Sequence, residues 1–135
     1  MSMESFMNNL ISKILCLALI LFAFSIQAKN YTYICDYKQY SNPKGLHDVK
    51  NDFNITIIFD SDAEKSYMVG ELGTTDLIPV FNIGGGITFI ETTDSGNVMT
   101  TTIELVSRKS VHSRNSLVFG ELIPSQYYGE CEIKR

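Results

Sequence analysis

The chain has 135 residues, of which 44% are hydrophobic and 19% are charged, and its formal net charge is −4. This composition is that of a globular protein and excludes a disordered or fibrous chain, and the length suffices for one domain. An acidic chain lacks the basic surface on which nucleic-acid binding depends, so we expect no nucleic-acid partner. Trp is absent, whereas seven Tyr and eight Phe are present, and these aromatic residues favour β-strands.

The first 28 residues have the three-part pattern of a secretory signal peptide. A mixed segment that ends with Lys13 precedes the apolar run Ile14–Phe24, and the small residue Ala28 follows it. A spanning helix needs about 20 apolar residues, and this run is much shorter. The alternatives are a short membrane anchor and an amphipathic helix of the folded domain. We predict a signal peptide over residues 1–28, cleavage after Ala28, and contact with the membrane only during export.

Two cysteines remain in the predicted mature domain, residues 29–135. Cys16 lies inside the apolar run and lacks the small preceding residues of a lipoprotein site. Cys35 and Cys131 have no other Cys or His at the spacing of a zinc site, so a disulfide is preferred over a metal pair or two free thiols. Because disulfides form in oxidising compartments, we expect the protein to be periplasmic or secreted.

From Tyr31 onward, short runs of β-forming residues alternate with turn residues, and no helical period is present. In the first run, Tyr31–Gln39, the tyrosines and Cys35 share one face, and a loop is expected over Ser41–Asp48. The run Phe53–Phe59 places its Phe and Ile residues on one side. The acidic turn Asp60–Lys65 then leads into a strand over residues 66–71.

The second half continues this pattern. Pro79 within the run Leu77–Asn82 indicates an edge or a bulge, and Gly84–Gly86 precedes the strand Ile87–Thr92. Asp94–Asn97 is typical of a hairpin turn. The remaining predicted strands are Val98–Val106, Val111–Phe119 and Tyr127–Lys134, the last with Tyr127, Gly129, Cys131 and Ile133 on one face.

These elements predict one all-β domain, with about eight antiparallel strands in a meander. A small closed barrel of lipocalin type and a sandwich both fit this order, and closure is preferred because it removes both sheet edges. The cysteines lie in the first and last runs. The disulfide would therefore fasten the seam of a barrel or cross between the sheets of a sandwich.

The candidate ligand-binding residues are aromatic or basic. A set of tyrosines could line a small-molecule pocket, and ordinary packing in the core or at its rim is the alternative. The set is Tyr31, Tyr33, Tyr37, Tyr67, Tyr127 and Tyr128, from which we select Tyr33, Tyr37 and Tyr67 as ligand-binding candidates. His112 and Arg114 fall on the polar face of their strand, which we expect to be solvated. They are nevertheless the best candidates outside the loops to bind an anion.

No motif assigns a catalytic residue, a metal or a cofactor. Asp60, Asp62 and Glu64 imitate the start of a calcium loop, but Lys65 occupies the position that needs glycine, so a solvated turn is expected. Gly84–Gly86 precedes a strand and not the helix that a phosphate site needs. Asn30 and Asn54 begin glycosylation sequons, which matter only in a eukaryotic source.

Three stretches near the C-terminus, Val98–Ile103, Ser110–Asn115 and Glu121–Cys131, resemble parts of short exported bacterial proteins of no assigned activity. The resemblance covers roughly the last third of the chain. It implies an exported all-β protein and transfers no functional residue. At the level of the fold, the analogy is to eight-stranded barrels such as lipocalins and small exported protease inhibitors.

We expect an exported, non-enzymatic protein that binds a small molecule or a protein partner. The alternatives are a small secreted enzyme that uses His112 with a neighbouring acid, and a structural envelope protein.

Overall fold

The structure is a computed structural model that describes residues 29–135, so the predicted signal peptide and its cleavage site before Lys29 lie outside the described residues. Among residues 29–135 there is no helix long and apolar enough to cross a membrane. Nine strands form in this part of the chain: β1 (Asn30–Asn42), β2 (Gly45–Asp48), β3 (Asn54–Asp60), β4 (Lys65–Gly70), β5 (Gly73–Asn82), β6 (Gly86–Thr92), β7 (Val98–Glu104), β8 (Lys109–Val118) and β9 (Glu121–Lys134).

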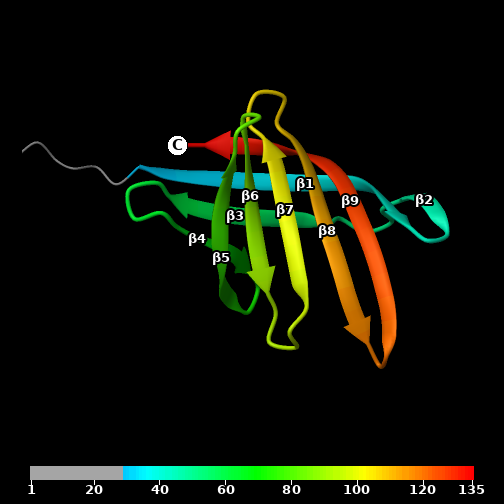
Figure 1. Cartoon of the computed structure of the whole chain (residues 1–135). Helices are drawn as coiled ribbons and strands as arrows, with labels where there is room; N and C mark the ends of the chain where they lie inside the picture. The colour runs from blue at the N-terminus through cyan, green and yellow to red at the C-terminus, as the bar shows by residue number, and fades with distance from the viewer. Residues whose placement is uncertain (1–28) are drawn as a thin grey trace, which may run out of the picture.

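The strands form an antiparallel meander that closes on itself. β9 pairs with β8 on one side and with β1 on the other, so β1 and β3–β9 make an eight-stranded closed barrel. β2 pairs with β1 and extends it as a hairpin. In Figure 1, β1, β3 and β4 cross the direction of β6–β8, and β9 curves from one group of strands towards the other. The predicted all-β barrel is confirmed, and the sandwich is not formed.

Alternate positions along each strand fill the barrel interior. The predicted faces of the first, third and last strands are confirmed, because their aromatic, Ile and Cys residues are buried or pack against the core. An eight-stranded barrel is just wide enough for side chains to fill. The buried hydrophobic residues are Tyr33, Cys35, Tyr37, Ile55, Ile57, Phe59, Leu77, Ile87, Phe89, Ile103 and Cys131.

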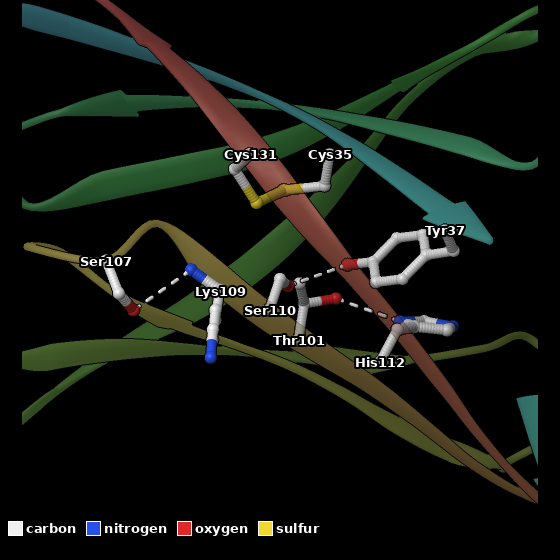
Figure 2. Close-up of a disulfide and its surroundings, with 8 residues drawn as sticks. All are labelled: Cys35, Tyr37, Thr101, Ser107, Lys109, Ser110, His112 and Cys131. Carbon is white, nitrogen blue, oxygen red and sulfur yellow. Dashed lines mark hydrogen bonds between the residues drawn. A yellow bond between two sulfur atoms is a disulfide. The ribbon is translucent and has the colours of Figure 1, made fainter. Parts of the chain in front are cut away.

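The disulfide fastens the seam of the barrel. Cys35 of β1 and Cys131 of β9 are directly opposite in the antiparallel register, with their Cα atoms 3.9 Å apart. Figure 2 shows the bridge on the interior side, next to the side chain of Tyr37. The bond therefore links neighbouring strands, as the barrel alternative predicted, and it connects segments 96 residues apart in sequence.

A β-bulge interrupts the pairing of β1 with β9 a few residues beyond the disulfide. The β1–β9 register shifts between Tyr37 and Gln39, so Lys38 is the extra residue of β1. At this point the backbones approach so closely that a Cβ on Gly129 would overlap the carbonyl oxygen of Asp36 and lie 2.9 Å from the Cα of Tyr37. Only glycine fits opposite the bulge. The bulge bends β1 and shifts by one residue which of its side chains face the interior.

Two segments differ from the sequence-based expectation. The predicted loop Ser41–Asp48 is a hairpin, in which β1 continues to Asn42 and pairs with β2 across the turn Pro43–Lys44. β5 begins at Gly73 and changes partner along its length: its first half, up to Leu77, pairs with β4 and its second half pairs with β6. Pro79 lies in the second half, where β5 has a paired strand on one side, in agreement with the predicted edge.

Candidate functional site

The interior contains polar as well as apolar side chains. Ser66, Thr101, Ser110 and His112 are buried among the aromatic and aliphatic residues. The hydroxyls of Tyr37 and Ser110 share a hydrogen bond of 2.9 Å, and burial raises the pKa of Tyr37 to about 12. No buried side-chain nitrogen or oxygen within the described chain is left without a hydrogen-bond partner. The buried polar groups are therefore satisfied in pairs, and Figure 2 shows the Tyr37–Ser110 and Thr101–His112 bonds.

His112 joins two polar side chains, Thr101 and Arg114, and only 2% of its surface is exposed. Its Nδ1 lies 2.9 Å from the Thr101 hydroxyl, and its Nε2 lies 3.2 Å from Nε of Arg114. Burial, with a smaller contribution from the positive charge of Arg114, lowers the pKa of His112 to about 4. The imidazole is therefore neutral near pH 7. Because Arg114 can only donate, Nε2 is the acceptor, and Nδ1–H donates to Thr101.

Arg114 follows His112 on β8 and lies where the pairing of β7 with β8 ends, at one end of the barrel. Its guanidinium carbon is 4.9 Å from the centre of the Phe53 ring and 5.3 Å from the centre of the Tyr127 ring. These two rings are themselves 4.7 Å apart, so they form a platform under the cation. Together with the bond to His112, the platform fixes the orientation of the guanidinium.

The aromatic surface continues outward from this platform onto the β1–β2 hairpin. The Tyr40 ring stacks on Tyr127 at 5.4 Å and contacts the His47 ring at 5.0 Å. Asn42 holds His47 through a hydrogen bond of 3.1 Å between Oδ1 and Nε2. All these side chains are half-buried and thus accessible from solvent. We call the set Tyr40, His47, Phe53, Arg114 and Tyr127 the Arg114 cluster.

Arg114 forms no ion pair with a carboxylate of the described residues. The two ion pairs formed within residues 29–135 join Lys38 to Asp36 and Lys134 to Glu132. The acidic group that influences Arg114 is Glu91 of β6: burial raises the pKa of Glu91, and the attraction of Arg114 opposes this rise. In the same part of the chain, the one side-chain hydrogen bond of Arg114 is that with His112. The guanidinium therefore keeps N–H groups that can bind an anion.

The structure brings together three of the five residues predicted to bind a ligand. Tyr37, His112 and Arg114 are neighbours, with 6.0 Å between the centres of the Tyr37 and His112 rings. Tyr33 is buried further along the barrel, where it packs on Phe89. Tyr67 alternates with the inward-facing Ser66 and Met68 and so lies on the outer face of β4.

The expectation that His112 lies on a solvated face is wrong. The stripe Ser110, His112 and Arg114 faces the barrel interior, because the hydroxyls of Tyr37 and Thr101 supply it with hydrogen-bond partners there. The neighbours of His112 are a hydroxyl and a guanidinium, and neither of its two hydrogen bonds involves a carboxylate. The structure thus provides no support for the alternative in which His112 acts with an acid.

Sequence reasoning did not assign Tyr40, His47 or Phe53 to the site, whereas Tyr127 belonged to the set of tyrosines that could line a pocket. Phe53 and Tyr127 were placed on the correct faces, but their contact joins β9 to the segment before β3, which are far apart in sequence. Tyr40 follows the bulge at Lys38, which moves the inward phase by one residue, so a strict period of two puts it on the wrong side.

The other candidate motifs form turns. Oδ1 of Asp60 accepts hydrogen bonds from the backbone N–H groups of Asp62 and Ala63, which closes the acidic turn. Gly85, with its positive φ of 91°, forms the turn between β5 and β6. Asn30 and Asn54 are exposed at the beginnings of β1 and β3. No group of three His, Cys, Asp or Glu side chains that could hold a metal ion is present among residues 29–135.

Comparisons with known proteins supply no family assignment. No family model matches the sequence, and neither curated proteins nor solved structures give a significant match.

Proposed function

We propose that the protein is an exported binding protein, and that the Arg114 cluster binds a small molecule with a carboxylate and a flat apolar body. The signal-peptide pattern supports export, and the Cys35–Cys131 disulfide is compatible with an oxidising extracellular compartment. The observation that carries the proposal is the guanidinium of Arg114, which is oriented by His112 and two rings and forms no ion pair with a carboxylate of residues 29–135.

The site lies at the barrel end because the interior is filled. Tyr37, Phe89 and Ile57 are almost completely buried in the centre of the barrel, so a ligand would meet the half-buried rings of the Arg114 cluster instead. A planar guanidinium pairs with a carboxylate through two parallel hydrogen bonds. The neighbouring rings of Tyr40, His47 and Tyr127 provide the surface on which a flat group can stack.

Titration of the protein with benzoate, followed by NMR, tests the proposal. We expect benzoate to shift the Arg114 Nε–H resonance and the ring resonances of Phe53 and Tyr127, and benzamide, which has no charge, to shift them much less. Arg114→Gln should abolish the difference between the two probes. Arg114→Lys should bind benzoate more weakly than the wild type, because Lys keeps the charge but loses the planar, bidentate geometry.

Arg108→Gln is the matched control. Arg108 is exposed in the turn between β7 and β8, at the opposite end of the barrel, so its loss removes the same charge and should leave benzoate binding unchanged. Equal weakening by Arg108→Gln and Arg114→Gln would show a general charge effect and contradict the site. The proposal would also fail if benzoate and benzamide shifted the same resonances equally.

A carboxylate can come from a metabolite or from the end of a polypeptide. Two tripeptides that end in Phe separate these sources, one with a free C-terminal carboxylate and one with a C-terminal amide. A peptide-binding site should bind the peptide acid more tightly than benzoate, and the amide shows whether the carboxylate of the peptide is recognised. Tighter binding of benzoate than of the peptide acid supports the small-molecule ligand. The reverse order would replace it with a protein partner at the same Arg114 cluster.

A further inference from the structure

The end of the β8–β9 hairpin projects beyond the barrel. β8 pairs with β7 only up to Arg114, and β9 pairs with β1 only from Gln126 onward. Within the described chain, the strand residues between these two points therefore pair only with each other. Figure 1 shows this part of the hairpin at the lower right, where it extends past the other strands. We call residues 115–125 the projecting hairpin.

The projecting hairpin exposes large apolar side chains on both of its faces. Leu117 and Leu122 are opposite each other on the outer face, and alternation places Val118 and Ile123 on the other face. Phe119 occupies the turn. The exposed fractions of these five side chains range from 41% for Val118 to 104% for Phe119. A third of the large hydrophobic residues exposed in residues 29–135 are gathered here, so the hairpin is apolar on all sides.

Phe119 is placed where neither packing nor backbone geometry favours it. Its φ is 50° and that of Gly120 is 84°, so both central residues of this two-residue turn are in the left-handed region. Asn and Gly are favoured at such positions, and a large side chain is disfavoured. Because the ring is fully exposed, it packs on nothing within residues 29–135. A side chain held in a disfavoured conformation without packing contacts points to a role outside the fold.

Charge is nearly absent from the projecting hairpin. Glu121 is the one charged residue among residues 115–125. The β4–β5 and β6–β7 turns, at the same end of the meander, carry Glu71 and Asp94 and no Lys or Arg. This apolar hairpin of an acidic protein has no basic residues beside it in these turns, so an electrically neutral surface suits it better than an anionic one.

We propose that the projecting hairpin inserts into the surface of a lipid bilayer with electrically neutral headgroups. The hairpin is narrow and apolar on both faces and at its turn. A flat protein surface that packs on one face leaves the other face in water, whereas fluid acyl chains cover all sides at once. The sequence-based expectation limits membrane contact to export, and this proposal adds a contact made by the folded protein.

The length of the hairpin suits shallow insertion. Leu117 is two residues from Phe119, which is about 7 Å along a strand, and Arg114 is about 17 Å from it. Segments that bind at the membrane surface bury their apolar side chains about 5–10 Å into the boundary between headgroups and acyl chains. Phe119 and the Leu117–Leu122 pair therefore reach this boundary, and Arg114 stays in water.

The backbone of the hairpin also fits an apolar environment, in which unpaired N–H and C=O groups are costly. β8 and β9 pair with each other up to Val118 and Glu121. On the two free edges, the Leu117 N–H donates to Oδ1 of Asn97 at 2.8 Å, and Pro124 has no N–H. Both features hinder the addition of a further strand, which is the other use that a free edge could have.

Flotation with vesicles of phosphatidylcholine tests the proposal. We expect the exported wild-type protein to float with the vesicles. Phe119→Asn removes the ring and suits the left-handed turn, so it should weaken vesicle binding at least about tenfold and leave the urea midpoint of unfolding at least as high. Ile83→Asn is the matched control. Ile83 is equally exposed in the β5–β6 turn at the opposite end of the barrel, so its loss should leave binding unchanged.

Glu121→Gln gives a second measurement, in the opposite direction. Removal of the one charge on the projecting hairpin should strengthen vesicle binding several-fold, because a carboxylate is costly at the apolar boundary. All variants have the same N-terminus, so differences between them report on the hairpin. The proposal would be overturned by a wild-type protein that does not float, by equal binding of the wild type and Phe119→Asn, or by binding that requires anionic phosphatidylglycerol.

Discussion

Arg114 donates a hydrogen bond from Nε to Nε2 of His112, and this contact joins the solvent-accessible Arg114 to the buried His112–Thr101 pair. It also determines which nitrogen of His112 carries the proton. A cation that remains charged beside the ring, together with burial, keeps the ring neutral. The site and the stability of the fold are therefore coupled through one histidine.

Acidification should destabilise the protein through His112. Its pKa is lowered from 6.5 to about 4 in the folded state, so between these values the unfolded chain binds more protons than the folded one. Stability is then fully present above about pH 6.5 and is lost as the pH falls towards 4, with a total loss of about 3 kcal/mol. Urea unfolding at several pH values measures this. His112→Gln should reduce the pH dependence and His47→Gln should keep it; equal curves for the wild type and His112→Gln would contradict the assignment.

Removal of the charge of Glu91 should strengthen anion binding at the Arg114 cluster. Glu91→Gln eliminates the negative charge that acts on Arg114, so the guanidinium attracts a ligand carboxylate more strongly. Titration with benzoate should give a dissociation constant several-fold lower than that of the wild type. Asp94→Asn, in the exposed β6–β7 turn, is the control and should change affinity little. Weaker binding by Glu91→Gln would mean that Glu91 contacts the ligand favourably.

Reduction of the Cys35–Cys131 bridge should lower the free energy of unfolding by about 2–5 kcal/mol, since the bond restricts a long loop in the unfolded chain. Hydrogen exchange should show that the C-terminal segment, residues 127–135, loses protection first. The comparison of oxidised protein with Cys35→Ser/Cys131→Ser provides the measurement. Non-reducing peptide mapping of the exported protein should give the linked peptides, and two free thiols there would refute the bridge.

The two faces of β3 should respond very differently to truncation. Phe59 is buried against Phe81 and Phe89, so Phe59→Ala should cost about 3–5 kcal/mol. Thr56 faces outward, and Thr56→Ala should cost less than about 1 kcal/mol. Chemical denaturation of both variants decides this, and similar costs would show that the burial of β3 is misassigned.

A methyl group at position 129 should open the seam. Gly129→Ala places a Cβ against the backbone of Asp36 and Tyr37, which cannot move independently of β1, so we expect a loss of roughly 2 kcal/mol or more. Gly70→Ala is the matched control in another strand, where the nearest atom to a new Cβ is the Gly73 oxygen at 3.7 Å. Similar stability of the two variants would contradict the close approach at the bulge.

Alternation of apolar residues predicted most of the barrel, because strands such as Phe53–Phe59 put all their large apolar side chains on one face. It failed where the interior is polar. On β8 the buried stripe is Ser110 and His112, while Val111 faces outward, so the pattern alone suggests the reverse orientation. The partners that make this burial possible, Tyr37 and Thr101, come from other strands.

The candidate site was predicted only in part for a related reason. His112 and Arg114 are two residues apart and their chemistry is visible in the sequence. The platform under Arg114 comes from Phe53 and Tyr127, which meet only when β9 closes against β1. The position of Tyr40 depends on a bulge that backbone geometry reveals and residue type does not.

Closure of β9 on β1 also constrains when the protein can fold. β1 lacks its pairing with β9 until β9, the last strand, has been synthesised. Cys35 likewise has no native partner until Cys131 follows it, 96 residues later. Such long-range pairing is slow to form because the loop must close before the contacts stabilise it. A chain with this topology cannot close its barrel or form its native disulfide until β9 has been synthesised.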